Sequence, residues 1–470
     1  MQQQQPTVVI VGAGFCGTAV AVHLLRQLPP SARLVLVEQD ARLARGVAYG
    51  TRCLSHRLNV PAGRLGLEPG HESGFIEWLQ QHHEGWRAAD FVPRALMGDY
   101  LAHCLQQARE AAAARGLAFE CISGVAVTGM EPRRPGHLLA LSDGRQLLAD
   151  QVVLANGHLP TRPPHLPALA WGEPGLLADP WSAEALDSLP EDAAVLVLGT
   201  GLTAIDLWAD LQDRGHQGQI TLLSRRGQLP QPHRSLEARP FEGPSPVAQL
   251  PADFGLRQLM RSVRRWAREA PDQGRDWRDV LASLRGSTPS LWQRLSPRER
   301  RQFLRHVQPW WDTHRHRLAP GLHRRLEAAI GAGHVLPLAG RIRSLQRLPD
   351  GRLRIGVQHR GSALTQHLDV SLIVNCTGAS SALRHTDQAL LASLREQGLL
   401  TPDELDLGLL VDEQYRPQAR DASAVQGLRY VGPMLKAQRW EAVAVPELRQ
   451  HAGAVAARVL EDLALPGRLT

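Results

Sequence analysis

The spacing of apolar residues predicts a strand, a helix and a second strand at the beginning of the chain. Residues 8–11 and 34–37 are unbroken apolar runs with the length of strands that are buried on both faces. Between these runs, apolar side chains at residues 19, 20, 22, 24 and 25 follow the helical period. Glycines at positions 12, 14 and 17 separate the first strand from the helix. The pattern therefore predicts a β–α–β unit with a glycine-rich turn after its first strand.

Three glycines and one acid give this unit its predicted chemistry. Gly12 permits a tight turn, Gly14 lets a pyrophosphate approach the backbone, and Gly17 lets the helix pack on the strand. The free N–H groups at the start of the helix face the phosphates. Glu38, which follows the second apolar run, can accept hydrogen bonds from a ribose. We predict dinucleotide binding; the alternative is a glycine-rich turn in another kind of α/β domain.

The same order of elements recurs later in the chain. An apolar run at residues 195–198 leads into a second glycine turn, in which Ala204 replaces the third glycine. The next predicted strand, residues 220–223, is followed by two arginines, Arg225 and Arg226, rather than by an acid. Two copies of one supersecondary plan predict two dinucleotide-binding domains.

The residues after the second strand of each copy distinguish two cofactors. An acid suits a ribose with free hydroxyls, whereas arginine suits a ribose that carries a 2′-phosphate. We therefore predict FAD in the first domain and NADPH in the second. The alternative for Arg225 and Arg226 is a solvated basic turn.

Shorter patterns supply the other elements of an α/β fold. The predicted helices span residues 75–82 and 94–115. The predicted strands span residues 121–127, 138–141, 146–148, 152–157, 354–358, 367–370 and 372–378. Asp-Gly pairs at residues 143–144 and 350–351 indicate turns of antiparallel hairpins, and the proline-rich run 160–167 is typical of a linker between domains.

The second copy contains an insertion at about residues 240–330 that is rich in arginine and tryptophan and is predicted to be mostly helical. We expect a small core built by its tryptophans, Trp266, Trp277, Trp292, Trp310 and Trp311. His314 and His316 are two residues apart, which on a helix points them away from each other and disfavours a metal pair. We interpret residues 310–317 as a packed and solvated helix face, with an anion or substrate contact as the alternative.

These elements predict an α/β fold of two Rossmann-like dinucleotide-binding domains, for FAD and NADPH, with antiparallel β hairpins and a helical insertion in the second domain. We expect residues 1–165 to form the first part of the FAD-binding domain and residues 376–470 its C-terminal part. Residues 166–375 are expected to form the NADPH-binding domain, with the insertion inside it.

Composition narrows the class of protein. The chain has 470 residues, of which 43% are hydrophobic, as is usual in globular proteins. No apolar run approaches the roughly 20 residues of a membrane span, and the N-terminus lacks the pattern of a signal peptide, so we expect a cytoplasmic protein without a membrane span.

The five cysteines include no Cys-x-x-Cys pair, which disfavours zinc ribbons and redox dithiols; we expect no metal.

The basic residues of the chain are almost all arginine. The formal net charge is +7, and Lys436 is the only lysine. Such a skew is typical of genome composition, so we discount the charge as a sign of nucleic-acid binding and expect none.

Several motifs together resemble one family. They lie at residues 12–17, 46–49, 58–64, 199–203, 224–227, 311–317 and 440–449. Through them, nearly the whole chain resembles the FAD/NAD(P)-binding protein family of two-dinucleotide-domain flavoproteins. It more distantly resembles class B flavin monooxygenases and N-hydroxylating monooxygenases. One signature of those monooxygenases, Phe-x-Gly-x-x-x-His-x-x-x-Trp/Tyr, is absent; residues 172–188, with Trp181, stand in its place.

The resemblance implies an FAD-dependent, NADPH-using oxidoreductase, with a flavin monooxygenase as the leading interpretation. Its substrates would be molecular oxygen and a small nucleophile, an amine or a sulfur compound. Asn59 matches an asparagine that lies beside the flavin in flavin monooxygenases, and it is our candidate catalytic hydrogen-bond donor; a structural loop asparagine is the alternative. Two other functions stay open: an NADPH–flavin reductase that serves a quinone or a protein partner, and a non-catalytic nucleotide-binding sensor.

The C-terminal segment is expected to return to the first domain. Gly432 ends a predicted strand where a flavin can meet the backbone, and Trp440 and Glu441 precede a helix that is predicted to run through residue 457. The start of this helix can direct N–H groups at the flavin, although Trp440 can instead pack a domain interface. The full set of candidate cofactor-binding residues is Gly12, Gly14, Phe15, Cys16, Gly17, Glu38, Asn59, Val125, Asn156, Gly157, Gly199, Gly201, Leu202, Thr203, Ser224, Arg225, Arg226, Gly432, Trp440 and Glu441.

Overall fold

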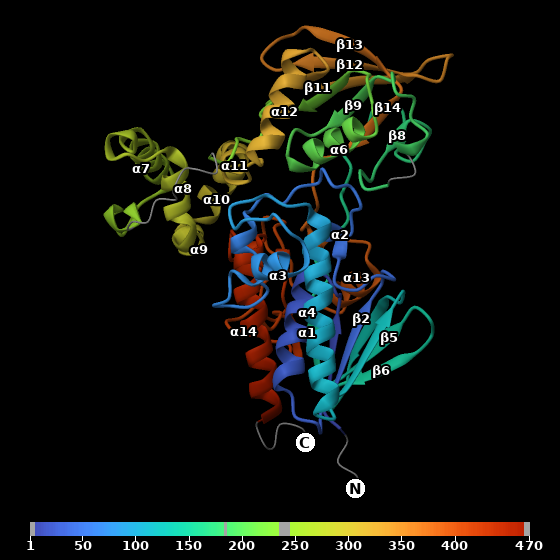
Figure 1. Ribbon diagram of the computed structural model, residues 1–470, viewed down its shortest axis with the longest axis vertical. Helices are drawn as coiled ribbons and strands as arrows, with labels where there is room; N and C mark the ends of the chain where they lie inside the picture. Colours follow the sequence, from blue (N-terminus) through green and yellow to red (C-terminus); the bar gives the residue numbers. More distant parts are fainter. Residues whose placement is uncertain (1–4, 183–185, 235–244, 465–470) are drawn as a thin grey trace.

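The computed structural model describes residues 5–182, 186–234 and 245–464. Two mainly parallel sheets are stacked along the long axis of the molecule, and a group of short helices projects to one side (Figure 1). This arrangement confirms the predicted α/β class with parallel sheets and antiparallel hairpins. The predicted start of the insertion, residue 240, and the two chain ends lie outside the described residues.

The first sheet has five parallel strands in the order β15-β7-β1-β2-β3. The strands are β1 (Thr7–Val11), β2 (Arg33–Glu38), β3 (Ala118–Ser123), β7 (Gln151–Leu154) and β15 (Leu428–Tyr430). Every residue of β1, β7 and β15 is buried, because helices cover one face and further chain covers the other. The C-terminal strand thus joins a sheet begun by the N-terminus.

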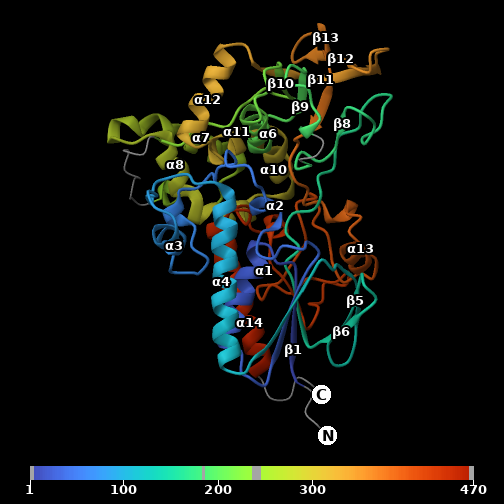
Figure 2. The same cartoon turned by 45° about the vertical axis from the view of Figure 1, so that its right-hand side comes forward.

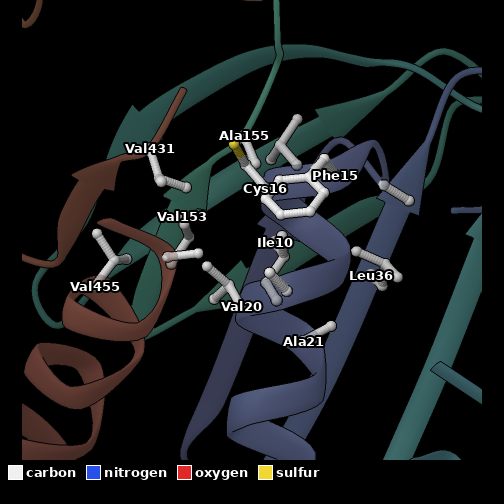
Figure 3. Close-up of a cluster of buried hydrophobic side chains, with 14 of the residues drawn as sticks. Ile10, Phe15, Cys16, Val20, Ala21, Leu36, Val153, Ala155, Val431 and Val455 are labelled. Atoms are coloured by element: carbon white, nitrogen blue, oxygen red, sulfur yellow. The ribbon is translucent and has the colours of Figure 1, made fainter. Parts of the chain in front are cut away.

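Three long helices line one face of the first sheet. They are α1 (Phe15–Gln27), α4 (Arg94–Ala114) and α14 (Val445–Ala464), and they lie side by side in both views (Figures 1 and 2). Figure 3 shows Val20 of α1 over Ile10 of β1 and Val153 of β7, with Val455 of α14 close by. This packing fixes the start of α1 above the carboxyl ends of β1 and β7.

A three-stranded antiparallel sheet, β4-β5-β6, accompanies the first sheet. It consists of β4 (Val127–Pro132), β5 (His137–Leu141) and β6 (Gln146–Ala149). The single strand predicted at residues 121–127 is wrong, because Gly124 has a φ of +72° and breaks it into β3 and β4. At the break, the backbone N–H groups of Gly124 and Val125 donate to the carbonyls of Asp40 and Glu38, both at 3.1 Å.

The second sheet has the order β13-β12-β11-β10-β9-β14-β8. Its parallel part contains β8 (Leu176–Leu177), β9 (Val195–Leu198), β10 (Ile220–Ser224), β14 (Leu372–Asn375) and the start of β11 (Val335–Arg347). The strands β12 (Leu353–His359) and β13 (Thr365–Val370) continue it as antiparallel hairpins. The helices α6 (Leu202–Asp213) and α12 (Pro320–Gly331) pack on this sheet.

The insertion is helical, as predicted. Its elements are η2 (Pro246–Gln249), α7 (Leu256–Glu269), η3 (Pro271–Gln273), α8 (Trp277–Leu284), η4 (Arg285–Ser287), α9 (Thr288–Arg294), α10 (Pro297–Gln302), η5 (Phe303–Val307) and α11 (Gln308–Arg315). Trp266 and Trp292 are buried in its two hydrophobic clusters. Trp310 is 52% exposed, so its assignment to the core was wrong: it lies on the outer side of α11, next to His314.

The remaining helices connect these parts. They are α2 (Gly46–Tyr49), η1 (Ala62–Arg64), α3 (Gly74–His82), η6 (Leu383–His385), α13 (Ala389–Glu396) and η7 (Pro433–Ala437). Across the part of the chain that the structure describes, every helix falls short of the length and apolarity that a membrane span requires.

Candidate functional site

A cavity of about 1250 Å³ opens at the carboxyl ends of β1, β2 and β7. This edge is where ligands bind in open parallel sheets. Eight of the candidate residues line the cavity: Gly12, Gly14, Phe15, Cys16, Glu38, Val125, Asn156 and Gly157. The structure therefore brings together residues from four separate stretches of the sequence.

The three glycines of the first turn meet three different surroundings. A Cβ on Gly12, which has a φ of +100°, would lie 2.5 Å from the Ala155 carbonyl oxygen, and one on Gly17 would lie 1.8 Å from the Gly12 carbonyl oxygen. A Cβ on Gly14 would meet nothing closer than the Gly46 Cα, at 3.7 Å. Gly12 and Gly17 are thus required by the fold, whereas Gly14 leaves open space beside the start of α1, where the N–H groups of a helix attract phosphate.

Glu38 sits directly behind this turn. One carboxylate oxygen accepts a hydrogen bond from the Ala13 N–H at 2.6 Å, and the other accepts one from the Asp40 N–H at 3.0 Å. The side chain is buried, yet it forms part of the cavity wall. Each carboxylate oxygen has a second lone pair, so Glu38 can still accept a hydroxyl of a ribose.

Asn156 supplies a test of whether the cavity fits a bound cofactor. Its Oδ1 atom is buried and has no hydrogen-bond partner in the described structure, which is unusual because buried polar atoms are normally paired. Gly157 follows it with a φ of +71° and open space where a Cβ would stand. An unpartnered acceptor next to an open glycine fits a cavity that is completed by a polar ligand.

The cavity extends beyond the first sheet. Its wall includes Arg42 and Arg45 near α2, Trp181 in the connection to the second sheet, and Asp210 and Asp213 of α6. Arg45 is held by an ion pair with Asp99 at 2.7 Å. Both halves of the molecule therefore contribute to the wall of this cavity.

The second glycine turn repeats the backbone geometry of the first. The Gly199 N–H donates to the Leu223 carbonyl and the Cys376 N–H to the Leu198 carbonyl, both at 2.8 Å, as Gly12 and Ala155 do with Val37 and Val11. Gly199 has a φ of +122°, and a Cβ there would lie 2.2 Å from the Cys376 carbonyl oxygen. Gly201 faces open space, and the buried Ala204 replaces the third glycine.

Leu202 and Thr203 begin α6 directly after this turn. The turn does not line the 1250 Å³ cavity, so the second set of candidate residues lies apart from it. At the end of β10, the Ser224 hydroxyl accepts hydrogen bonds from the Gly227 N–H at 2.9 Å and from the Thr200 hydroxyl at 3.1 Å.

The two arginines after β10 differ in their surroundings. Arg225 is exposed and has no hydrogen bond or ion pair with any described residue. Arg226 donates to the backbone carbonyls of Arg305 and His306 in the insertion, at 3.0 and 3.4 Å. Arg225 is therefore the guanidinium that remains available to a phosphate, while Arg226 ties the insertion to the second sheet.

Asn59 does not line the cavity. Its backbone carbonyl accepts a hydrogen bond from His233 Nε2 at 2.9 Å, which joins its loop to the segment before the insertion. Burial, followed by the charge of Arg317, lowers the pKa of His233 to about 3, so this ring is neutral at pH 7. Within the part of the chain that the structure describes, the Asn59 side chain forms no hydrogen bond, so its predicted role as a donor stays a prediction.

The candidate residues of the C-terminal segment divide into two groups. Gly432 has a φ of +151° and leads into η7, whose first residue, Pro433, lines the cavity. Trp440 is buried among residues of the insertion, and the centres of its ring and of the Trp292 ring are 4.6 Å apart. Glu441 is 2% exposed and pairs with Arg315 of α11 at 2.8 Å. Trp440 and Glu441 therefore hold the insertion in place and lie outside the cavity wall.

Sequence reasoning missed the residues that join the two sheets. Arg94 of α4 pairs with Asp206 of α6 at 2.8 Å, and His56 Nε2 donates to the Asp206 carbonyl at 3.2 Å. Burial lowers the pKa of His56, so its ring is neutral, and Nδ1 accepts a hydrogen bond from the Thr51 hydroxyl at 2.7 Å. No motif or spacing marks these residues, because they are brought together only by the docking of the two halves.

Comparison with known proteins agrees with this geometry. Residues 9–159 match a family model described as FAD-NAD(P)-binding, which confirms the predicted resemblance for that part of the chain. Comparison with curated protein sequences gives no match.

Solved structures resemble the chain over nearly its whole length. The L-lysine 6-monooxygenase from Pseudomonas syringae has a TM-score of 0.66 at 17% identity, covering 98% of this chain and all of that one. The ornithine N-hydroxylase of Kutzneria sp. 744 has a TM-score of 0.65 at 16% identity, with 98% and 100% covered. The FAD-bound cadaverine monooxygenase of Erwinia amylovora has a TM-score of 0.62 at 12% identity, with 97% and 94% covered. These likenesses establish a shared fold.

Proposed function

We propose that this protein is a cytoplasmic FAD-dependent, NADPH-using oxidoreductase, and specifically a monooxygenase that uses molecular oxygen on a small amine or sulfur nucleophile. The observation that carries the proposal is the cavity at the carboxyl ends of β1 and β7. It combines the open position at Gly14, the carboxylate of Glu38 and the unpartnered Oδ1 of Asn156. The fold shared with an ornithine N-hydroxylase, an L-lysine 6-monooxygenase and a cadaverine monooxygenase supports the same reaction class.

The residues of the first turn would hold FAD. The N–H groups of Phe15 and Cys16 at the start of α1 would bind the pyrophosphate beside Gly14, and Glu38 would accept the ribose hydroxyls. Asn156, Gly157 and Val125 would border the cofactor along the cavity. When bound, FAD supplies the redox chemistry, since it accepts a hydride from NADPH and passes electrons to oxygen.

The second turn would hold NADPH. Gly201 leaves the backbone at the start of α6 open to a pyrophosphate, with Leu202 and Thr203 providing the first N–H groups of that helix. Arg225 would pair with the 2′-phosphate through charge-assisted hydrogen bonds. The proposed domains accordingly are residues 1–165 with 376–470 for FAD and residues 166–375 for NADPH.

The protein would also exclude water and fix the two cofactors relative to each other. The buried Arg94–Asp206 pair and the His56 hydrogen bond hold the two sheets together beside the cavity. Asn59 remains our proposed donor near the flavin, and its loop is positioned by His233.

The proposal is tested by the absorption spectrum of the purified protein. We expect bound FAD that is bleached by NADPH without oxygen, and NADPH consumption in air that is coupled to oxygen transfer when a suitable amine or thiol is present. Release of one peroxide for each NADPH with every nucleophile tried would instead support a reductase or oxidase. Bound nucleotide without any NADPH oxidation would support a sensor.

A further inference from the structure

The cavity contains a second buried acceptor without a partner, apart from Asn156. The Oε1 atom of Gln388 is buried and accepts no hydrogen bond from any described residue, although Gln388 forms part of the cavity wall. A buried amide oxygen that is left unpaired destabilises a folded protein, because it has lost its water without gaining another donor. A ligand that donates a hydrogen bond to Oε1 would remove this cost.

The backbone of Gln388 is fixed, whereas its side-chain amide is unengaged. Gln388 directly precedes α13; its N–H donates to the Thr386 hydroxyl at 3.2 Å, and its carbonyl accepts from the Ala392 N–H at 2.8 Å. The amide at the end of the side chain forms no hydrogen bond within the described ranges of the chain. The side chain is thus anchored at the cavity wall with both of its polar atoms available to a ligand.

The packing of α13 places Gln388 near the start of β4. Leu390 of α13 belongs to the same hydrophobic cluster as Val127 and Met130 of β4. At the other end of the helix, Gln397 Nε2 donates to the Met130 carbonyl at 3.1 Å. Figure 2 shows α13 beside the three-stranded sheet. Since Gln388 and Val127 both line the cavity, α13 begins where β4 begins.

The start of β4 is tied to the end of β2, where Glu38 lies. The Val125 N–H donates to the Glu38 carbonyl at 3.1 Å, two residues before β4 begins at Val127. The Glu38 carboxylate in turn accepts from the Ala13 N–H in the glycine turn, at 2.6 Å. A chain of contacts therefore leads from the glycine turn through Glu38 and the start of β4 to Gln388.

The groups of an adenine nucleotide follow one another in the same order. The ribose stands between the phosphate and the base, so a nucleotide with its phosphates at Gly14 and its ribose at Glu38 would carry its base beyond Glu38. Adenine has a 6-amino group that donates hydrogen bonds, next to ring nitrogens that accept them. Glutamine matches this edge, because Oε1 accepts from the amino group while Nε2 donates to a ring nitrogen.

We propose that Gln388 recognises the adenine base of the bound FAD, with Oε1 accepting a hydrogen bond from the 6-amino group. The inference rests on the FAD site of the proposed function and deepens it by assigning a residue that determines specificity for the base. Gln388 lies outside residues 9–159, which match the family model. Both parts of the proposed FAD-binding domain would then contact the adenosine half of the cofactor.

A competition between two flavins tests the proposal. The full-length protein is equilibrated with equal concentrations of FAD and of an analogue in which hydrogen replaces the 6-amino group of adenine. The protein is then separated and denatured, and chromatography measures how much of each flavin it releases. We expect about tenfold more FAD than analogue, because the analogue leaves Oε1 unpaired.

Two variants assign the preference to one residue. Gln388→Met removes the acceptor at nearly the same side-chain length and should bind the two flavins equally. Gln107→Met, at an exposed glutamine of α4, is the matched control and should keep the tenfold preference. Equal binding by the natural protein would show that the amino group is not bonded. A preference that persists in Gln388→Met would show that another residue bonds it, and either result would overturn the proposal.

The same measurement separates this inference from the proposed function. It needs neither NADPH nor oxygen, so it reports on the base site even in a protein that never turns over. A preference for FAD in a protein that never oxidises NADPH would refute the oxidoreductase and leave Gln388 as the adenine contact. Flavin that is bound without preference and is reduced by NADPH would refute the role of Gln388 and leave the oxidoreductase. A protein that takes up neither flavin would refute both.

Discussion

Arg94, the first residue of α4, forms a buried ion pair with Asp206 of α6, with 2.8 Å between Nη2 and Oδ2. The side chains are 16% and 5% exposed. Burial raises the pKa of Asp206, and Arg94 opposes this rise. The pair connects a helix of the first sheet to a helix of the second, so it fixes the relative position of the two proposed nucleotide sites.

Breaking this pair from the arginine side should be costly. Arg94→Met leaves Asp206 buried without a direct counter-charge, and we expect a loss of about 3–5 kcal/mol in the free energy of unfolding in urea. The double variant Arg94→Met/Asp206→Asn removes the buried charge as well and should recover part of that loss. A change below about 1 kcal/mol in the single variant would mean that water reaches Asp206.

The glycines of the first turn should separate folding from cofactor binding. Gly14→Val places a side chain in the open space beside the start of α1, so we expect a folded protein without FAD. Gly17→Ala, a smaller change, should instead impair folding, since its Cβ would lie 1.8 Å from the Gly12 carbonyl oxygen. Circular dichroism and the FAD released on denaturation measure the two effects. A Gly14→Val protein with full FAD content would place the pyrophosphate elsewhere.

The preference for NADPH should depend on Arg225 more than on Arg226. Arg225 has no partner among the described residues, so Arg225→Ala should remove only the proposed contact to the 2′-phosphate. We expect kcat/KM for NADPH to fall by roughly 10- to 100-fold, with NADH unaffected, from the 1.5–3 kcal/mol of a charge-assisted hydrogen bond. Arg226→Ala is the matched control: it should loosen the insertion through Arg305 and His306 and change both nicotinamides alike.

Trp440 should behave as a core residue of the insertion. The centre of its ring is 4.6 Å from that of Trp292 and 5.1 Å from that of Phe303. Trp440→Ala should therefore cost about 3–5 kcal/mol in the free energy of unfolding. Trp310→Ala, at a ring that is 52% exposed, is the control and should be close to neutral. If Trp440→Ala shifted the flavin spectrum without lowering stability, the ring would contact the cofactor after all.

The stability of the protein should depend on pH through Asp312. Burial raises the pKa of Asp312 to about 6 from its ordinary value of 3.8. The raised pKa means that the folded state favours the protonated acid. Asp312 therefore contributes a stabilisation of the folded state that is complete below about pH 4 and is lost as the pH rises to about 6. Asp312→Asn cannot ionise, so its Tm should exceed that of the natural protein at pH 8 and match it at pH 4. Equal Tm differences at both pH values would show that Asp312 titrates normally.

The sequence by itself determined the two turns and the hairpins. Gly12 adopts a φ of +100°, Gly17 lets α1 approach the Gly12 carbonyl, and Glu38 meets Ala13, all within one β–α–β unit. Such short-range geometry recurs whenever the pattern of strand, glycines and helix recurs, which is why Gly199 repeats the bonding of Gly12. Alternating apolar residues around an Asp-Gly pair likewise specify a hairpin without reference to the rest of the chain.

Only the tertiary structure decided which distant residues meet. The position of Trp440 after a predicted strand favours a place beside a flavin. In the structure its ring packs on Trp292, because the insertion folds back on the C-terminal segment. The Arg94–Asp206 pair likewise depends on docking. Side-chain pairing across a domain junction is set by how whole surfaces fit, and residues more than a hundred positions apart leave no local pattern from which that fit can be read.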